Sequence, residues 1–573
     1  MLPWRMGFFP HNPRRVFLLL AALVGALLMV LLAVPKSMAT TALRWSDPVA
    51  ISELDDEEMT IAGVPALAVD HYGSIHTVWH SVKLDISEQR EPGTQAAAYH
   101  DLLIYRARID DTWTTSSIIF QRERPSLGDA GSTLSGGAGM YNPAFELRGQ
   151  LLTGRDSKLH MLVGNTGRQW FLTAALDEVV RNLLLFPPWP LSQGPHSHMA
   201  LDQHDGTLHM VMNEIPPGIE TIAQMLEGDS ERKICSDCPY IFYRFSDNGG
   251  TIWSLTENLS DDEQDEQDEQ DEQDEQDQQD QQEDAHALYP QITVDERQRV
   301  HVIWEERKNA DAVGGQLVYR YADAGATDWS TPRKLGVLDE PVTQAVLGLN
   351  QANTLMLVYR GTRSNSVFYQ SSSDGGNTWT SPRIIPDVQA RGQRQALYPR
   401  FSMAADSQGH IHLLMVGLQP GSGSATAQLL HLHWDGQRWS APVRIATGAD
   451  NPLGPQLVIE RGNRLHALWF TSNFHPVSRA EQQLVWYSSA QLTAPEQAPA
   501  PTFTPHPDTL PTATPEPVIL PTPTPLAEQL ARLETLDGPP LWELRGLQGV
   551  GVGLLSAALL ISFVGMVYLR LRR

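Results

Sequence analysis

One pattern recurs through the middle of the chain: an apolar strand, a tight polar turn, and a second strand that begins with a histidine. From residue 301 onward, successive copies are spaced by about 55 residues. The anchor positions of the seven copies are His76, His160, His209, His301, Met356, His412 and His466. This repeat constrains the fold more than any other feature, because each unit must bury its apolar face against its neighbours.

Each copy continues into an aromatic third strand, such as "LVYRYA", and then into a Gly/Asp turn, a tryptophan and a closing strand. Alternating strands with short turns and no convincing helical stretch predict an all-β chain. Four strands in a period of about 55 residues are typical of a β-propeller blade. The sequence therefore predicts a β-propeller of seven four-stranded blades. Six blades are the alternative, since the copy between residues 143 and 192 is poorly patterned.

The last copy lacks a closing strand, because the chain runs from "LVWYSS" (Leu484 to Ser489) into a proline-rich tract. Its counterpart stands at the other end of the domain. The segment "LRWSDPVAI" (Leu43 to Ile51) closely matches the closing strand "QRWSAPVRI" (Gln437 to Ile445). An N-terminal strand is therefore expected to complete the last blade, which closes the ring and removes an exposed sheet edge.

The turn before the closing strand is best preserved in "SSSDGGNTW", which contains Ser372, Asp374, Gly376, Thr378 and Trp379. A second copy, "SDNGGTIW", contains Ser246, Asn248, Gly250 and Trp253. Glycine supplies the positive φ of a tight turn, the short polar side chains hydrogen-bond its backbone, and tryptophan packs between blades. None of these roles needs a substrate, so the turn is predicted to be structural.

These turns resemble the Asp-box, or BNR repeat, of the sialidase-like β-propellers, and the resemblance extends over about residues 43–490. It implies that the boxes lie remote from the catalytic centre, which would lie among the long loops. A sialidase-like site would hold a carboxylate with three arginines and would use a tyrosine activated by a glutamate, with an aspartate as acid/base. The candidates of the right type near the long loops are Tyr398, Glu305, Glu306, Arg307, Arg360 and Arg400.

Two departures from that family count against catalysis. The Arg-Ile-Pro signature is absent from the start of the domain, and the acid/base aspartate has no identifiable counterpart. The first functional hypothesis is therefore a binding or adhesion module for a glycan or protein ligand. The alternative, from the enzyme class, is a sialidase-like exo-glycoside hydrolase acting on sialylated or related glycans.

The recurring histidines raise the alternative of a metal-binding ring of imidazoles. They begin second strands, one layer out from the innermost strand, and Met356 breaks the set. We therefore expect structural histidines, no metal site and no cofactor.

The only two cysteines, Cys235 and Cys238, are separated by two residues. If the pair is functional, it supplies two of the ligands of a metal site or acts as a redox pair. Two ligands do not fill a zinc shell, and no βαβ pattern surrounds the pair. On an exported chain a local disulfide is favoured.

The formal net charge of −25 is concentrated in residues 261–284, a run of Asp, Glu and Gln. Without apolar residues this run cannot pack, so it is predicted to be a disordered insertion in the propeller. Diffuse attraction of calcium is the only cofactor interaction it suggests. No basic patch accompanies it, and nucleic acid is not an expected partner.

Both ends of the chain have the composition of membrane-targeting segments. Residues 1–39 combine basic, apolar and small residues as a signal peptide or signal anchor, and cleavage is favoured. Residues 495–525 form a Pro/Thr-rich stalk. Residues 549–569 are an uncharged span predicted to be a transmembrane helix, and the basic residues in 570–573 predict a cytoplasmic tail. The sequence thus predicts a single-pass cell-membrane protein with an extracellular propeller.

Overall fold

The computed structural model describes residues 43–52, 64–85, 98–123, 148–155, 158–165, 168–175, 184–185, 196–214, 239–260, 285–309, 312–323, 328–391, 400–421, 426–445, 451–474 and 481–499. The chain divides into two compact units, Met1–Thr504 and Pro505–Arg573, and every described residue belongs to the first. The predicted N-terminal segment 1–39, the acidic insertion, the transmembrane helix and the tail lie outside the described residues, as does most of the stalk.

The regular elements that the structure describes are β-strands, which pair antiparallel in six sheets. The first sheet contains β2 (Ala66–Val69), β3 (Ile75–Asp85), β4 (Ala98–Ile109), β5 (Thr112–Trp113) and β6 (Ser117–Glu123). The second contains β7 (Arg148–Thr153), β8 (Lys158–Asn165), β9 (Arg168–Ala175) and β10 (Leu184–Leu185). The third contains β11 (Ser197–Leu201), β12 (Leu208–Glu214), β13 (Tyr240–Ser246) and β14 (Glu257–Asn258).

The fourth sheet contains β15 (His286–Val294), β16 (Val300–Arg307), β17 (Gln316–Ala322) and β18 (Arg333–Leu335). An eight-stranded sheet contains β19 (Val342–Leu349), β20 (Leu355–Gly361), β21 (Ser366–Ser372), β22 (Arg383–Ala390), β23 (Phe401–Ala405), β24 (Ile411–Leu418), β25 (Gln428–Trp434) and β26 (Val443–Arg444). The last sheet contains β27 (Pro452–Glu460), β28 (Arg464–Phe474), β29 (Glu481–Gln491) and β1 (Val49–Ala50).

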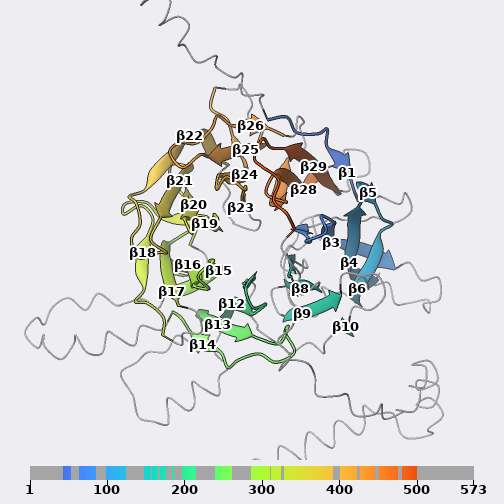
Figure 1. Ribbon diagram of the computed structural model, residues 1–573, viewed down its shortest axis with the longest axis horizontal. Coiled ribbons are helices and arrows are strands. Elements are labelled where there is room, and N and C mark those ends of the chain that lie inside the picture. Colours follow the sequence, from blue (N-terminus) through green and yellow to red (C-terminus); the bar gives the residue numbers. More distant parts are fainter. Residues whose placement is uncertain are drawn as a thin grey trace, which may run out of the picture. The chain divides into compact units, whose positions relative to one another are not determined.

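The sheets follow one another around a ring in a propeller-like, all-β arrangement (Figure 1). Each first strand contacts the first strand of the next sheet, in the order β2, β7, β11, β15, β19, β23, β27 and back to β2. The eight-stranded sheet departs from the expected separate units. It consists of two four-stranded meanders that are joined because the last two residues of β22, Gln389 and Ala390, pair with Leu418 and Gly417 of β24.

The N-terminal segment completes the last sheet, as its sequence match predicts. In β1, Val49 pairs with Tyr487 of β29 and Ala50 pairs with Trp486. The backbone N–H of Ser46 donates to the carbonyl of Ser489 at 2.8 Å, extending the contact toward the N-terminus. The outer edge of β29 is therefore covered by a strand that precedes it by more than four hundred residues.

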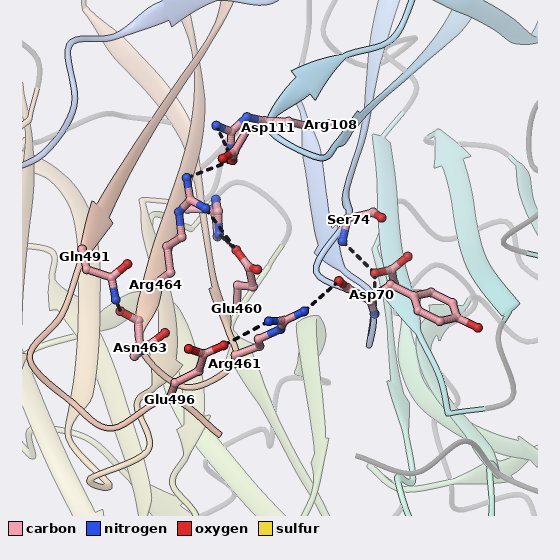
Figure 2. Close-up of polar contacts among 12 residues, drawn as sticks. Asp70, Ser74, Arg108, Asp111, Glu460, Arg461, Asn463, Arg464, Gln491 and Glu496 are labelled. Atoms are coloured by element: carbon pink, nitrogen blue, oxygen red, sulfur yellow. Dashed lines mark hydrogen bonds and ion pairs between the residues drawn. The ribbon is translucent and has the colours of Figure 1, made fainter. Parts of the chain in front are cut away.

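Polar contacts also join this last sheet to the first one (Figure 2). Arg461 forms a 3.0 Å ion pair with Glu496, and its second terminal nitrogen donates to the carbonyl of Tyr72 at 3.2 Å. Arg464 lies 3.2 Å from Asp111, a residue of the first sheet's third-to-fourth turn. Most of these groups are partly exposed, so they orient the two sheets more than they stabilise them.

Near the start of six closing strands, a tryptophan packs against the preceding sheet or meander; no such contact is described for β10 of the second sheet. Each tryptophan ring lies close to an aromatic or imidazole ring in the third strand of that preceding sheet or meander. The pairs are Trp113–Tyr487, Trp253–Phe171, Trp329–Tyr243, Trp379–Tyr319, Trp439–Tyr369 and Trp45–His431. Their centroids are 4.9–5.7 Å apart in near-perpendicular geometries, which is favourable for aromatic rings. These contacts explain why tryptophan recurs at this place in the sequence.

The recurring histidines are buried links within their own sheets. In the fourth sheet, Nδ1 of His301 lies 2.7 Å from the hydroxyl of Tyr319, and Nε2 lies 3.6 Å from a carboxylate oxygen of Asp295. Equivalent contacts join His76 to Tyr105 and Asp70, and His466 to Tyr487 and Glu460. A neutral imidazole whose Nε2–H faces the carboxylate accepts the tyrosine hydroxyl at Nδ1. The histidines thus connect the third-strand ring to the turn between the first two strands.

The Asp-box of the eight-stranded sheet forms a braced turn between β21 and β22. Ser372 Oγ donates to Asp374 Oδ1 and accepts from the Gly376 N–H, both at 2.8 Å. The backbone N–H and hydroxyl of Thr378 donate to the same carboxylate at 2.9 and 2.6 Å. Gly376 has a φ of 88°, and a Cβ there would lie 1.7 Å from the hydroxyl oxygen of Tyr319 in the preceding sheet. Glycine is therefore required at position 376 both by the positive φ and by the close approach to Tyr319.

The second Asp-box forms the same turn between β13 and β14. Ser246 Oγ donates to Asn248 Oδ1 at 3.0 Å and accepts from the Gly250 N–H at 2.9 Å. A Cβ on Gly250 would collide with Phe171, the partner of Trp253 in the preceding sheet. The asparagine thus replaces the aspartate as the brace of this turn.

Candidate functional site

The face opposite the Asp-boxes is formed where second strands end and first strands begin, and we call it the long-loop face. Four second strands carry a polar, buried residue four positions after the anchor. These residues are His80, Asn213, Glu305 and Arg360. Because buried polar groups need partners, this edge of the sheets is where a built polar site is expected.

Glu305 and Arg307, at the end of β16, form the best-connected pair on this face. Arg307 donates from Nη2 and Nε to Glu305 Oε2 at 2.6 and 3.1 Å. The hydroxyl of Thr343 and the backbone N–H of Gln344 donate to Oε1 at 3.0 and 2.7 Å. Both residues are buried. The carboxylate therefore joins the fourth sheet to the start of β19 in the next one.

Burial raises the pKa of Glu305, while Arg307 and the hydrogen bonds from Gln344 and Thr343 oppose that rise. Both carboxylate oxygens already accept hydrogen bonds from protein groups. The Glu305 carboxylate therefore holds Arg307 and the start of β19 in place, and both of its oxygens face hydrogen-bond donors of the protein.

Three arginines gather beside this pair, and we call Arg360, Arg391 and Arg400 the arginine cluster. Arg360, at the end of β20, pairs across the sheet with Thr343 and donates from Nη1 to the carbonyl of Arg391 at 3.1 Å. Arg391 follows β22 and donates to Asn451 Oδ1 at 2.6 Å. Arg400 precedes β23 and is only 1% exposed.

Arg400 is the unusual member of the cluster. All three of its guanidinium nitrogens are buried and have no hydrogen-bond partner among the residues that the structure describes, and the same holds for Nε of Arg360. Burial, followed by the charges of Arg391 and Arg360, lowers the pKa of Arg400 to about 10. The side chain is still cationic at neutral pH. A buried positive charge without a hydrogen-bonding partner among the described residues is a place where an anion is stabilising.

An aromatic residue lies against Arg307 of this pair. The guanidinium carbon of Arg307 is 4.7 Å from the centroid of the Tyr289 ring, within the range of a cation–π contact. The imidazole of His196 lies 4.2 Å from the same centroid at an interplanar angle of 38°. His196, Tyr289, Arg307 and Glu305 thus form a continuous row along the face.

The structure brings Glu305, Arg307, Arg360 and Arg400 to this one edge, and with Glu306 that makes five of the six catalytic candidates. Glu306 lies there too and accepts a 3.2 Å hydrogen bond from the indole of Trp304. Tyr398 lies outside the described residues, as do Cys235 and Cys238.

Two residues of the site were missed by the sequence analysis. Arg391 comes just after a closing strand, where no functional side chain was sought. Tyr289 stands in "LYPQ", and the same Leu-Tyr-Pro precedes Arg400 in "LYPR". That repeated tripeptide was a signal available in the sequence.

Within the described ranges, no group of three or more His, Cys, Asp and Glu side chains is arranged to hold a metal ion. A buried histidine–aspartate pair does occur on the first sheet, where His80 Nε2 lies 2.9 Å from Asp101 Oδ1 and both side chains are fully buried.

The part of the chain that the structure describes contains no helix long and apolar enough to cross a membrane.

No family model matches the chain, and no curated protein matches it. Among solved structures, a protein of unknown function from Dyadobacter fermentans is similar at 10% identity and a TM-score of 0.42, covering 79% of this chain and 100% of that one. The NanB sialidase from Streptococcus pneumoniae is similar at 12% identity and a TM-score of 0.37, covering 79% and 98%. The α-L-arabinanase of Penicillium chrysogenum is similar at 10% identity and a TM-score of 0.36, covering 78% of this chain and 98% of that one. Likeness this distant supports no conclusion about activity.

Proposed function

We propose that this chain is a cell-surface β-propeller that binds acidic glycans on its long-loop face. The arginine cluster holds the carboxylate of the ligand, and the sugar extends over the neighbouring edge of the sheets. The Pro/Thr-rich stalk and the apolar span 549–569 display the domain outside the membrane. A stalk of this kind suits a module that must reach its ligand.

The observation that supports this proposal most is the state of Arg400. A buried guanidinium without hydrogen bonds is destabilising, since its charge has lost water and gained no partner. A carboxylate accepts two parallel hydrogen bonds from such a fork. The free Nε of Arg360 supplies a further donor beside it. The ligand would therefore supply the counter-charge that the described residues around Arg400 do not supply.

A seven-bladed propeller is part of the proposal. It is supported by the cyclic contacts of seven first strands and by the two meanders of the eight-stranded sheet. Six tryptophan contacts follow the same order around the ring, and among the described residues they leave out the step between the first and second sheets.

Binding is favoured over hydrolysis by the state of Glu305. A glutamate that activates a tyrosine nucleophile needs a free carboxylate oxygen, whereas Glu305 is held by Arg307, Thr343 and Gln344. Its contacts suit a residue that positions Arg307.

The test measures binding of 3′-sialyllactose and of neutral lactose to the full-length protein by calorimetry. We expect binding of the acidic sugar alone. Arg400→Met should reduce its affinity at least about tenfold, since a charged hydrogen-bonded contact is lost. Arg438→Met is the matched control, because Arg438 is exposed and lies in an Asp-box-type turn. Equal affinity of Arg400→Met and the unaltered chain would refute the proposal.

Turnover of a fluorogenic sialoside is measured on the same samples. Release of the fluorophore that is lost in Tyr398→Phe or Glu305→Gln would make the protein a hydrolase and overturn the preference for binding alone.

A further inference from the structure

Three first strands carry the same irregularity at the long-loop face. In β15, β19 and β27, two residues stand opposite a single residue of the partner strand, which is a β-bulge. The first residue of each bulge has positive φ: 55° for Tyr289, 57° for Gln344 and 56° for Gly454. The backbone is thus the same at three equivalent places, and only the side chain differs.

Glycine is the unstrained choice for this backbone, and the last sheet uses it at residue 454. A large aromatic residue with such a φ is a genuine outlier, because its Cβ crowds the backbone. Strain of this kind concentrates at functional sites, where the surrounding structure enforces it. The fourth sheet therefore places a tyrosine on the long-loop face against its backbone preference.

Two planar groups lie against the Tyr289 ring. Arg307 lies over the ring at 4.7 Å, and Arg307 is itself fixed by Glu305. His196 of the third sheet lies against the ring at 4.2 Å. Tyr289 remains only partly buried. The result is a row of planar side chains that ends, through Glu305 and Thr343, beside the arginine cluster.

We infer that Tyr289 and His196 form a stacking subsite for a pyranose ring, next to the position of the carboxylate. The C–H face of a pyranose is apolar and suits an aromatic surface, while its hydroxyl groups face polar neighbours. This inference rests on the proposed function and deepens it. The ligand is then an oligosaccharide with an acidic sugar over the arginine cluster and a neutral sugar over Tyr289.

The test compares two ligands of different length on the full-length protein. Free N-acetylneuraminic acid reaches the arginine cluster only, whereas 3′-sialyllactose also reaches Tyr289. Tyr289→Gly should lower the affinity for 3′-sialyllactose about fivefold, as expected for loss of one stacking contact. The affinity for the monosaccharide should stay unchanged. Tyr289→Phe should retain the affinity, since it keeps the ring.

A second measurement separates function from packing. Because Tyr289→Gly relieves the strained φ, its thermal unfolding midpoint should equal or exceed that of the unaltered protein. Tyr321→Ala is the matched control. Tyr321 also lies under an arginine, Arg299, at 4.3 Å, but on the Asp-box side, so its loss should not affect binding.

The outcomes distinguish the two proposals. If neither sugar binds the unaltered protein, the proposed function fails, and the subsite fails with it. If both sugars bind and Tyr289→Gly weakens neither, the subsite alone is refuted. A lower unfolding midpoint together with equal weakening of both sugars would make Tyr289 a packing residue and would also refute the subsite.

Discussion

The indole of Trp45 lies edge-on to the imidazole of His431, with centroids 5.4 Å apart and planes at 68°. Trp45 belongs to the N-terminal segment, and His431 to β25 of the preceding sheet. The other tryptophans of this set make the same contact with a tyrosine or phenylalanine. Trp45 therefore connects the sheet that it completes to its neighbour, and it does so with the one contact in this set that involves a histidine.

Trp45→Ala is expected to weaken the closure. It removes a buried indole from the apolar cluster between these sheets and should lower the free energy of unfolding by about 3–5 kcal/mol. Urea denaturation followed by tryptophan fluorescence and circular dichroism measures the change. Trp45→Phe is the control and should lose clearly less, because it keeps an aromatic edge. An alanine variant as stable as the unaltered protein would show that the Trp45 contact is not needed for closure.

His431→Tyr is expected to make the protein more resistant to acid. Burial, followed by the nearby His412 and His433, lowers the pKa of His431 well below 6.5. The unfolded chain therefore takes up a proton near pH 6.5 that the folded protein does not, and the free energy of unfolding falls as the pH drops below that value. A tyrosine at this position also restores the pairing seen between His301 and Tyr319.

The measurement is the free energy of unfolding at pH 7.5, 6.0 and 5.0. Below pH 6.5 the variant should lose about 1.4 kcal/mol per pH unit less than the unaltered protein, the value for one proton. Identical pH dependence of the two proteins would contradict this account.

Gly376→Ala tests the contact made by the Asp-box. The new Cβ meets both a φ of 88° and the hydroxyl of Tyr319 at 1.7 Å. Gly436→Ala is the control, because Gly436 has a φ of 93° with nothing within 4 Å. The control should cost about 1–2 kcal/mol for its backbone alone. Gly376→Ala should cost about 1–3 kcal/mol more, since the neighbouring sheet must move. Thermal unfolding of the two variants measures the difference. Equal decreases in their unfolding midpoints would mean that the close approach of Gly376 to Tyr319 is unimportant for stability.

Glu305→Leu should be strongly destabilising because it leaves Arg307 buried and unpaired. The expected cost is about 3–5 kcal/mol of unfolding free energy. The double variant Glu305→Leu/Arg307→Met removes both charges and should recover most of that loss. Chemical denaturation of the two variants measures the difference. A double variant as unstable as the single one would show that Thr343 and Gln344, rather than the ion pair, dominate this junction.

Much of the fold could be predicted because it repeats. Period, third-strand aromatics and closing tryptophans indicate sheets of four strands, and the likeness of Leu43–Ile51 to Gln437–Ile445 identifies the strand that completes the last sheet. The joining of β22 to β24 could not be foreseen. It depends on how far β22 extends, and the two residues involved, Gln389 and Ala390, show no distinctive pattern.

The site was harder to predict because it depends on register and burial. Arg307, Arg360 and Arg400 have the same residue type in the sequence, yet one is paired, one is half paired and one has no partner. That difference arises from which strands lie beside each guanidinium. The strain at Tyr289 was likewise invisible, because a bulge is a property of the pairing between β15 and β16.

The pairing of β1 with β29 also has a consequence for biosynthesis. Ser46 and Ser488, which are in contact in the folded protein, are separated by 442 positions in the chain. A ribosome produces residue 46 long before its partner exists, so the first strand made is the last to find its place. Until then the N-terminal segment lacks its partner strand and the edge of the incomplete ring stays exposed, and a chain terminated before β29 has nothing with which to close.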